Sequence, residues 1–154
     1  MRQLATFALM TIVLCSCAST TQHKVKDWSR IDAGPKPELA ALKPAIENRI
    51  RKLMPDPQST KFTGWTVPYK DLKSWSADQP KVGVWSVCVE ADSKGQSGNY
   101  LGAETYWAII RDGAVIEIRD PGEYGTRKSR ELSAWRKKVC AQGAALGNSP
   151  PILK

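Results

Sequence analysis

Histidine is almost missing from this chain of 154 residues, in which His23 is the only one. Residues 18–37, the segment around it, are polar and show no sustained period, so His23 has no predicted partner. The rest of the chain therefore has no Ser–His–Asp or Cys–His arrangement and no usual catalytic zinc set. The glycine patterns that bind mononucleotides and dinucleotides are missing as well. We expect no metal site and no cofactor.

Carboxylates remain as candidate catalytic groups, because two of them are sufficient for glycoside hydrolysis. Acidic residues in or beside the predicted strands include Glu90, Asp92, Glu104 and Glu117. Nothing in their spacing brings two of them together across a cleft. Glu104 lies within a predicted strand, and the two-residue period of a strand would place it on the solvent face. The sequence favours a protein that is not an enzyme.

The first residues have the organisation of an export signal. Arg2 is followed by an uncharged, mostly apolar run over residues 4–14 (LATFALMTIVL), shorter than the roughly 20 residues of a transmembrane helix. Leu14–Cys15–Ser16–Cys17 then resembles the lipobox of bacterial lipoproteins. The resemblance implies a signal peptide over residues 1–16 and a lipid on Cys17 that anchors the protein in a membrane. The alternative is a plain secretory signal that is cut after Ala18.

The residues after Cys17 and the net charge bear on location and partners. Ala18 and Ser19 follow without an Asp at the second position, which in the sorting rule of enteric lipoproteins implies the outer membrane, at its periplasmic face. Lys and Arg number 23 against 15 Asp and Glu, and loss of Arg2 with the signal leaves +7. A solvated basic surface explains this charge, and so does an anionic partner in the envelope. Export argues against nucleic acid.

A lipidated cysteine and flexible tether (17–37) precede one globular domain (38–143) and a loose tail (144–154). From Glu38 onward, apolar residues recur on one helical face: Leu39, Leu42, Ile46, Ile50 and Leu53. Pro44 interrupts this pattern, so either two short helices meet there or one helix begins near Pro44.

Four later segments are rich in strand-forming residues: 61–67, 82–91, 100–110 and 114–119. The second is apolar on both faces, as expected of a central strand that is covered on both sides. Asp112–Gly113 predicts a tight hairpin between the last two segments, because both turn positions need a positive φ.

A final helix is predicted to start at Ser129 as its N-cap and to stop at Gly143, with an apolar face of Leu132, Trp135, Val139 and Cys140. Tryptophans within regular elements are expected in the core: Trp85, Trp107 and Trp135. Trp65 and Trp75 flank the connection 68–80 and are candidates for exposed contacts. The predicted fold class is α+β, with an N-terminal helix, an antiparallel meander of three to four strands and a C-terminal helix.

Two cysteines remain after the leader and the lipid site, Cys88 in the central strand and Cys140 in the last helix. An even pair in an oxidising compartment predicts a disulfide, which would stabilise the domain by roughly 4 kcal/mol. Two buried free thiols, or one reactive thiol, are the alternative.

Two segments resemble a family of small uncharacterised proteobacterial envelope proteins. Residues 56–62 (DPQSTKF) are similar to its DP-S-xx-F segment, and residues 88–102 are similar to its C-G-x-V-N-x-K-N-x-x-G-G-Y-x-G segment. The second departs from the family pattern at four positions: Val89, Asp92, Gly95 and Asn99. Together the segments cover roughly a fifth of the mature chain. The resemblance implies a domain type and an envelope location, and lends no catalytic residues.

The best candidates for ligand contact lie in the loop of the second segment: Lys94, Gln96, Asn99 and Tyr100. They would contact a polar ligand such as a glycan or a peptide, or they serve only to shape a hairpin. An anionic polymer would instead need two basic clusters to meet on one face: Arg49, Arg51 and Lys52 with Arg136, Lys137 and Lys138. A third hypothesis is an accessory or inhibitor protein of a cell-wall enzyme. The leading prediction is a structural or interaction module of the envelope.

Overall fold

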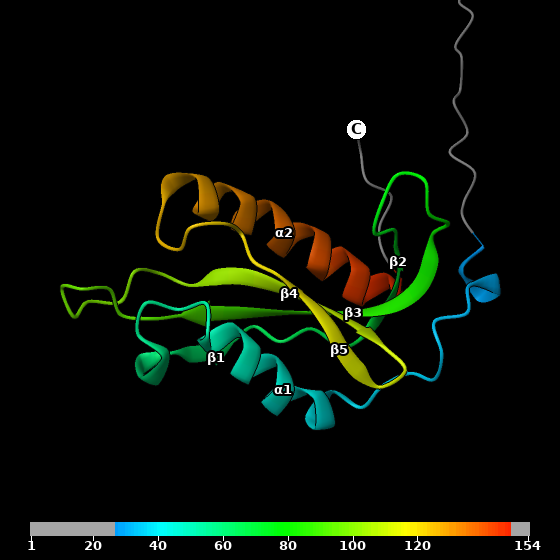
Figure 1. Cartoon of the computed structure of the whole chain (residues 1–154), viewed down its shortest axis with the longest axis horizontal. Coiled ribbons are helices and arrows are strands. Elements are labelled where there is room, and N and C mark those ends of the chain that lie inside the picture. The colour runs from blue at the N-terminus through cyan, green and yellow to red at the C-terminus, as the bar shows by residue number, and fades with distance from the viewer. Residues whose placement is uncertain (1–26, 149–154) are drawn as a thin grey trace, which may run out of the picture.

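A computed structural model describes residues 27–148 as three layers, with one helix on each face of an antiparallel sheet (Figure 1). In chain order the elements are η1 (Trp28–Arg30), α1 (Leu39–Arg51), η2 (Pro57–Ser59), β1 (Lys61–Thr63), β2 (Tyr69–Lys73), β3 (Val82–Asp92), β4 (Glu104–Arg111), β5 (Ala114–Arg119) and α2 (Arg127–Leu146). None of the helices among these residues is long and apolar enough to cross a bilayer. The predicted leader and Cys17 lie outside the described residues.

The sheet is built around the long strand β3, which pairs with β4 on one side and with both β1 and β2 on the other. The fold class is confirmed as α+β, with five strands where three to four were predicted. β1 and β2 lie one after the other along the same side of β3. The chain between them leaves the regular strand conformation at Gly64, which has φ +59°. Between them Thr66 still bonds to β3, donating its N–H to the Cys88 carbonyl and accepting from the Cys88 N–H through Oγ1.

β5 pairs with β4 through the predicted hairpin, which is confirmed. Asp112 and Gly113 occupy its turn at φ +50° and +75°, the left-handed region that a two-residue hairpin requires. β4 begins at Glu104, four residues later than predicted, because residues 93–103 form a longer loop than the sequence indicates.

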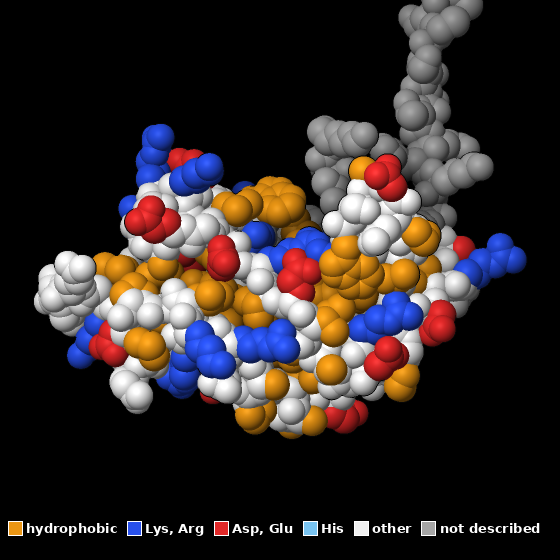
Figure 2. Space-filling model, viewed as in Figure 1, with side chains coloured by type: hydrophobic (Ala, Val, Ile, Leu, Met, Phe, Trp, Pro, Cys, Tyr) orange, Lys and Arg blue, Asp and Glu red, His pale blue; other side chains and the backbone are white. Residues whose placement is uncertain are grey.

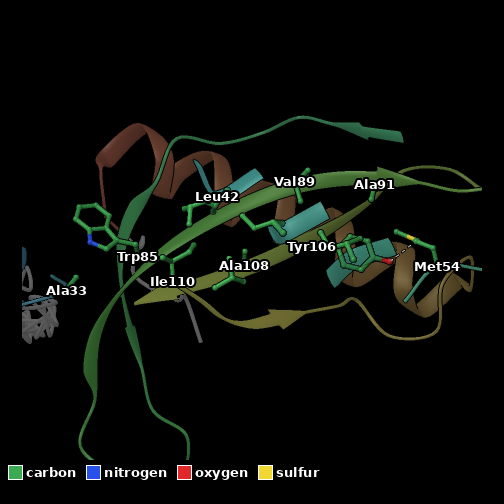
Figure 3. Close-up of a cluster of buried hydrophobic side chains, with 13 residues drawn as sticks. Ala33, Leu42, Met54, Trp85, Val89, Ala91, Tyr106, Ala108 and Ile110 are labelled. Carbon is green, nitrogen blue, oxygen red and sulfur yellow. Dashed lines mark hydrogen bonds between the residues drawn. The ribbon is translucent and has the colours of Figure 1, made fainter. Parts of the chain in front are cut away.

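α1 covers one face of the sheet through Leu42, Ile46 and Ile50, which are buried against β3, β4 and β5 (Figure 3). It is a single helix with Pro44 inside it, so neither predicted alternative is correct. Pro44 and Ala40 are both exposed. The Ala40 carbonyl, which loses its donor to Pro44, therefore faces water and stays solvated. Leu53 lies beyond the helix and is 46% exposed.

α2 covers the opposite face with a stripe of residues that overlaps the predicted one in part: Cys140 is buried as predicted, and Val139 packs against the core. The buried residues are Ser129, Ser133, Arg136, Cys140 and Gly143. Trp135 is 45% exposed, so its predicted core position is wrong, whereas Trp85 and Trp107 are buried as predicted. Small side chains let the helix approach closely: a Cβ on Gly143 would lie 2.8 Å from the Tyr69 ring.

Both predicted ends of α2 and both domain boundaries move outward. Thr126 is the N-cap and accepts from the Ser129 N–H, and Gly147 ends the helix at φ +69°. At the other end of the chain, Ala33 is buried in the core, and the Trp85 indole donates to the Gly34 carbonyl. The packed part of the domain thus includes residues before Glu38 and after Gly143.

Candidate functional site

The two segments that carry the family resemblance lie side by side. β1, from the first segment, pairs with the end of β3, from the second, with Lys61 opposite Asp92 and Phe62 opposite Ala91. The segments therefore form one structural unit at the end of the sheet that carries the β3–β4 loop (Figure 1).

Hydrogen bonds between polar groups, most of them half-buried, hold this unit together. The Asp56 carboxylate caps η2 by accepting from the backbone N–H groups of Gln58 and Ser59. Ser93 is fully buried, and its Oγ donates to the Asp56 carbonyl at 2.8 Å. The Lys94 N–H in turn donates to Ser59 Oγ at 3.0 Å. The bonds of Ser93 and Lys94 join the DPQS turn to the start of the loop and fix it there, and the cap bonds of Asp56 shape the turn itself.

Tyr124 also fixes the loop, a role that the sequence did not indicate. Together, Asp56, Ser93 and Tyr124 form the frame of the loop. The Tyr124 hydroxyl accepts from the Ser93 N–H, and lies 2.9 Å from both Asp92 Oδ1 and the Gly102 carbonyl. Burial and the Asp92 carboxylate raise the pKa of Tyr124, although the Ser93 N–H lowers it. The hydroxyl keeps its proton and donates it within the frame.

The outer surface of the loop brings two of the four predicted ligand residues together. Lys94 and Tyr100 face each other in an isolated bridge, with the Lys94 ammonium 5.7 Å from the centre of the Tyr100 ring. Lys61, which was not predicted, lies closer still, with its Nζ 4.1 Å from the same centre. Gln96 and Asn99 are exposed on the turn between them.

Lys61, Lys94 and Tyr100 are called the loop platform below. The Tyr100 hydroxyl donates to the Ser59 carbonyl at 3.1 Å, which anchors the ring on the frame while the residue stays 38% exposed. No carboxylate among residues 27–148 forms a salt bridge with either lysine. Two ammonium groups beside one ring favour an anionic ligand, since an anion relieves their mutual repulsion.

A second feature is an open cleft of about 580 Å³ between the end of α1 and residues 120–124. Met54 and Tyr106 are among its lining residues, and the Tyr106 hydroxyl donates to the Met54 sulfur at 3.7 Å (Figure 3). Asp120 and Glu123 also line it. Both come from the same loop and so share one wall, whereas a glycosidase pair flanks its substrate.

Glu104 is fully buried, contrary to the predicted solvent-facing position. Its Oε1 accepts from the Ser129 hydroxyl at 2.6 Å and from the Gly125 N–H at 3.0 Å. These donors belong to the first turn of α2 and the loop before it, where a carboxylate is stabilised by unpaired N–H groups and the helix dipole. Glu104 therefore connects the start of α2 to the start of β4.

The two basic clusters proposed for an anionic polymer do not meet. Arg49, Arg51 and Lys52 belong to α1 and its end, and the second cluster belongs to α2 on the other side of the sheet (Figure 1). Arg136 is itself buried and donates to the Arg119 carbonyl. Of the tryptophans expected to make exposed contacts, Trp75 is 51% exposed and Trp65 is partly buried against the α1 core.

A disulfide joins Cys88 and Cys140, as predicted, and links β3 to α2 across a Cα–Cα distance of 6.0 Å. Within the described part of the chain, no group of three His, Cys, Asp or Glu is placed to hold a metal ion. No protein-family model, curated protein or solved structure matches the chain.

Proposed function

We propose that this protein is a non-enzymatic, lipid-anchored module of the bacterial cell envelope, which binds a partner at the loop platform. The lipid is on Cys17, and the domain faces the periplasm from the outer membrane. The observation that carries the proposal is the convergence of Lys61 and Lys94 on the exposed ring of Tyr100.

The location is supported by two independent features. The first is the export signal, with Cys17 in a lipobox-like sequence. The second is the Cys88–Cys140 disulfide, since disulfides persist in oxidising compartments such as the periplasm and are rare in the cytosol.

The chemistry of the platform indicates an acidic group on an envelope protein as the ligand. The frame of Asp56, Ser93 and Tyr124 uses its polar groups internally, so the ligand contacts are left to the platform. A second candidate is an anionic polymer or glycan, which the two lysines without carboxylate partners favour. In both cases the binding is electrostatic and weakens with salt.

Intact mass of the protein purified from membranes tests the location. We expect a chain that begins at Cys17 with the added mass of two or three acyl groups, and two thiols that react with alkylating reagent only after reduction. An unmodified chain that begins near Ser19 would refute the lipid anchor.

Photo-crosslinking in intact cells tests the platform. A photoreactive amino acid replaces Tyr100, at 38% exposure, and in a matched control it replaces Ile116 on β5, at 39% exposure. We expect a discrete crosslinked product from position 100 only, lost in the Lys61→Glu/Lys94→Glu variant. Products of equal yield from both positions would refute a binding site at the loop.

A further inference from the structure

The outer surface of α2 differs in charge from the outer surface of α1. α2 exposes five basic residues and one acidic residue: Arg127, Lys128, Arg130, Lys137, Lys138 and Glu131. The exposed residues of α1 are instead Ala40, Ala41, Pro44, Ala45, Asn48 and Arg49. Figure 2 shows the basic side chains that protrude at the N-terminal end of α2, and apolar side chains along the middle of the helix.

Part of this positive charge has no acidic partner. Arg127 pairs with Glu131 within the helix, and Lys137 pairs with Glu90 of β3. Lys128 and Lys138 form no salt bridge among residues 27–148. Their ammonium groups are therefore available to an anionic surface.

Apolar side chains lie in line with Lys128 on one side of the helix. Trp135 and Leu146 are 45% and 60% exposed. They are eleven residues apart, which is about three turns, so they project from the same side of α2. Lys128 precedes Trp135 by seven residues and lies on that side too. Tryptophan flanked by lysine is typical of helices that lie in the interface of a membrane.

The described part of the chain begins, at Asp27, near the C-terminal end of this helix. Lys70 of β2 connects the two regions: its N–H donates to the Gly147 carbonyl at the end of α2, and its ammonium group donates to the Trp28 carbonyl. From Cys17 to Asp27 there are ten residues, which span at most about 35 Å. α2 itself is about 30 Å long, so a lipid on Cys17 keeps the whole helix within reach of the bilayer.

From these observations we infer that the exposed side of α2, which includes Lys128, Trp135 and Lys138, lies on the anionic headgroups of the membrane that holds the lipid. The inference rests on the proposed lipid anchor and adds to it an orientation. The domain lies flat on the bilayer, with the loop platform at the end remote from the tether.

Lysine footprinting of the protein purified from membranes tests this orientation. The protein is reconstituted into vesicles of phosphatidylcholine, or of phosphatidylcholine with about one third phosphatidylglycerol, and exposed to a membrane-impermeant amine reagent. We expect the labelling of Lys128 and Lys138 to fall about fivefold in the anionic vesicles and to recover at high salt. Lys43 and Lys52, at α1, serve as internal controls whose labelling stays constant.

Charge reversal provides the matched variants. Lys128→Glu/Lys138→Glu is expected to abolish the protection, and Arg49→Glu/Lys52→Glu, the same change on the other helix, is expected to leave it intact. Equal labelling in both kinds of vesicle would overturn the inference. Protection by a soluble polyanion but not by anionic vesicles would overturn it as well, and would assign the face to a polymer.

Intact mass of the same sample separates the two proposals. Acylated protein without protection refutes the orientation and leaves the anchor standing. Protein without acyl chains refutes the anchor, and its flotation with anionic vesicles then decides the membrane contact by itself: binding lost in Lys128→Glu/Lys138→Glu supports the contact, and no binding overturns it.

Discussion

On one face of the sheet, α1 buries Leu42, Ile46 and Ile50 among apolar side chains, and on the other, α2 buries Ser133, Arg136 and Cys140. The α1 face is an apolar core of thirteen buried residues. The α2 face has six such residues, two of which are the disulfide cysteines, together with a hydrogen bond that Glu104 accepts and one that Arg136 donates. Burial of apolar area thus holds α1, whereas a covalent bond and directional polar contacts hold α2. Some apolar residues of α2, such as Trp135, are therefore not needed in the core and lie on its outer surface.

The largest expected effect comes from removing the disulfide. Cys88→Ser/Cys140→Ser opens a loop with a sequence separation of 52 residues, which is expected to lower the free energy of unfolding by about 4 kcal/mol. Hydrogen exchange should show greater loss of protection in α2 than in α1, because only α2 loses its covalent link. Equal loss in both helices would contradict the distinction between the two faces.

Next in size is a cavity on the α1 face. Ile46→Ala removes a fully buried side chain from the apolar core and is expected to cost about 3 kcal/mol in urea denaturation. Leu53→Ala is the control from the same predicted helical pattern. Since Leu53 is 46% exposed, its replacement should change the stability by less than about 0.5 kcal/mol.

A smaller effect is expected where α2 approaches the sheet most closely. In Gly143→Ala the added Cβ would lie 2.8 Å from the Tyr69 ring, and the overpacking should destabilise the domain by about 1–2 kcal/mol. Helix propensity alone would change the stability in the opposite direction by about 1 kcal/mol. Thermal unfolding of this variant shows whether the net change in stability is positive or negative. Gln142→Ala, at an exposed neighbouring position, is the control. A stabilised Gly143→Ala protein would show that the Tyr69 ring leaves room for the added methyl group.

The smallest expected effect is a pH dependence of the stability that comes from Glu117 of β5. Burial alone raises the pKa of the Glu117 carboxyl, but hydrogen bonds from Lys73 and Arg119 outweigh it and hold the pKa below its ordinary value of 4.5. The ion pair therefore stabilises the fold at neutral pH, and this stability is lost as the pH falls below 4.5 through the folded-state pKa. In Glu117→Gln, the unfolding free energy should fall less steeply over that range, with a difference of about 1 kcal/mol or less. Identical slopes in both proteins would exclude this role of Glu117.

The difference between the faces also explains which elements could be predicted. α1, β3 and the Asp112–Gly113 hairpin follow from apolar periodicity and turn chemistry, which are local signals, and all three are present. β2 was missed because its inward residues Asp71 and Lys73 are polar. They are buried only because Ser86 and Glu117, distant in sequence, supply partners.

The buried side of α2 was predicted only in part, for a related reason. A search for apolar periodicity selects Leu132, Trp135, Val139 and Cys140, of which only Cys140 belongs to the buried stripe. That stripe is defined by the contacts of α2 with Glu104, Tyr69 and Cys88. In the candidate site, Lys94 and Tyr100 were predicted from loop composition. Lys61 and the Tyr124 frame were not, because they reach the loop from β1 and from residues beyond β5.

The Cys88–Cys140 bond also has a consequence for the order in which the molecule is completed. A chain grows from its N-terminus, so α1 and every strand of the sheet are synthesised before residue 140 appears. The native disulfide can therefore form only after every strand of the sheet has been synthesised. A chain that ends before residue 140 keeps Cys88 without its native disulfide partner.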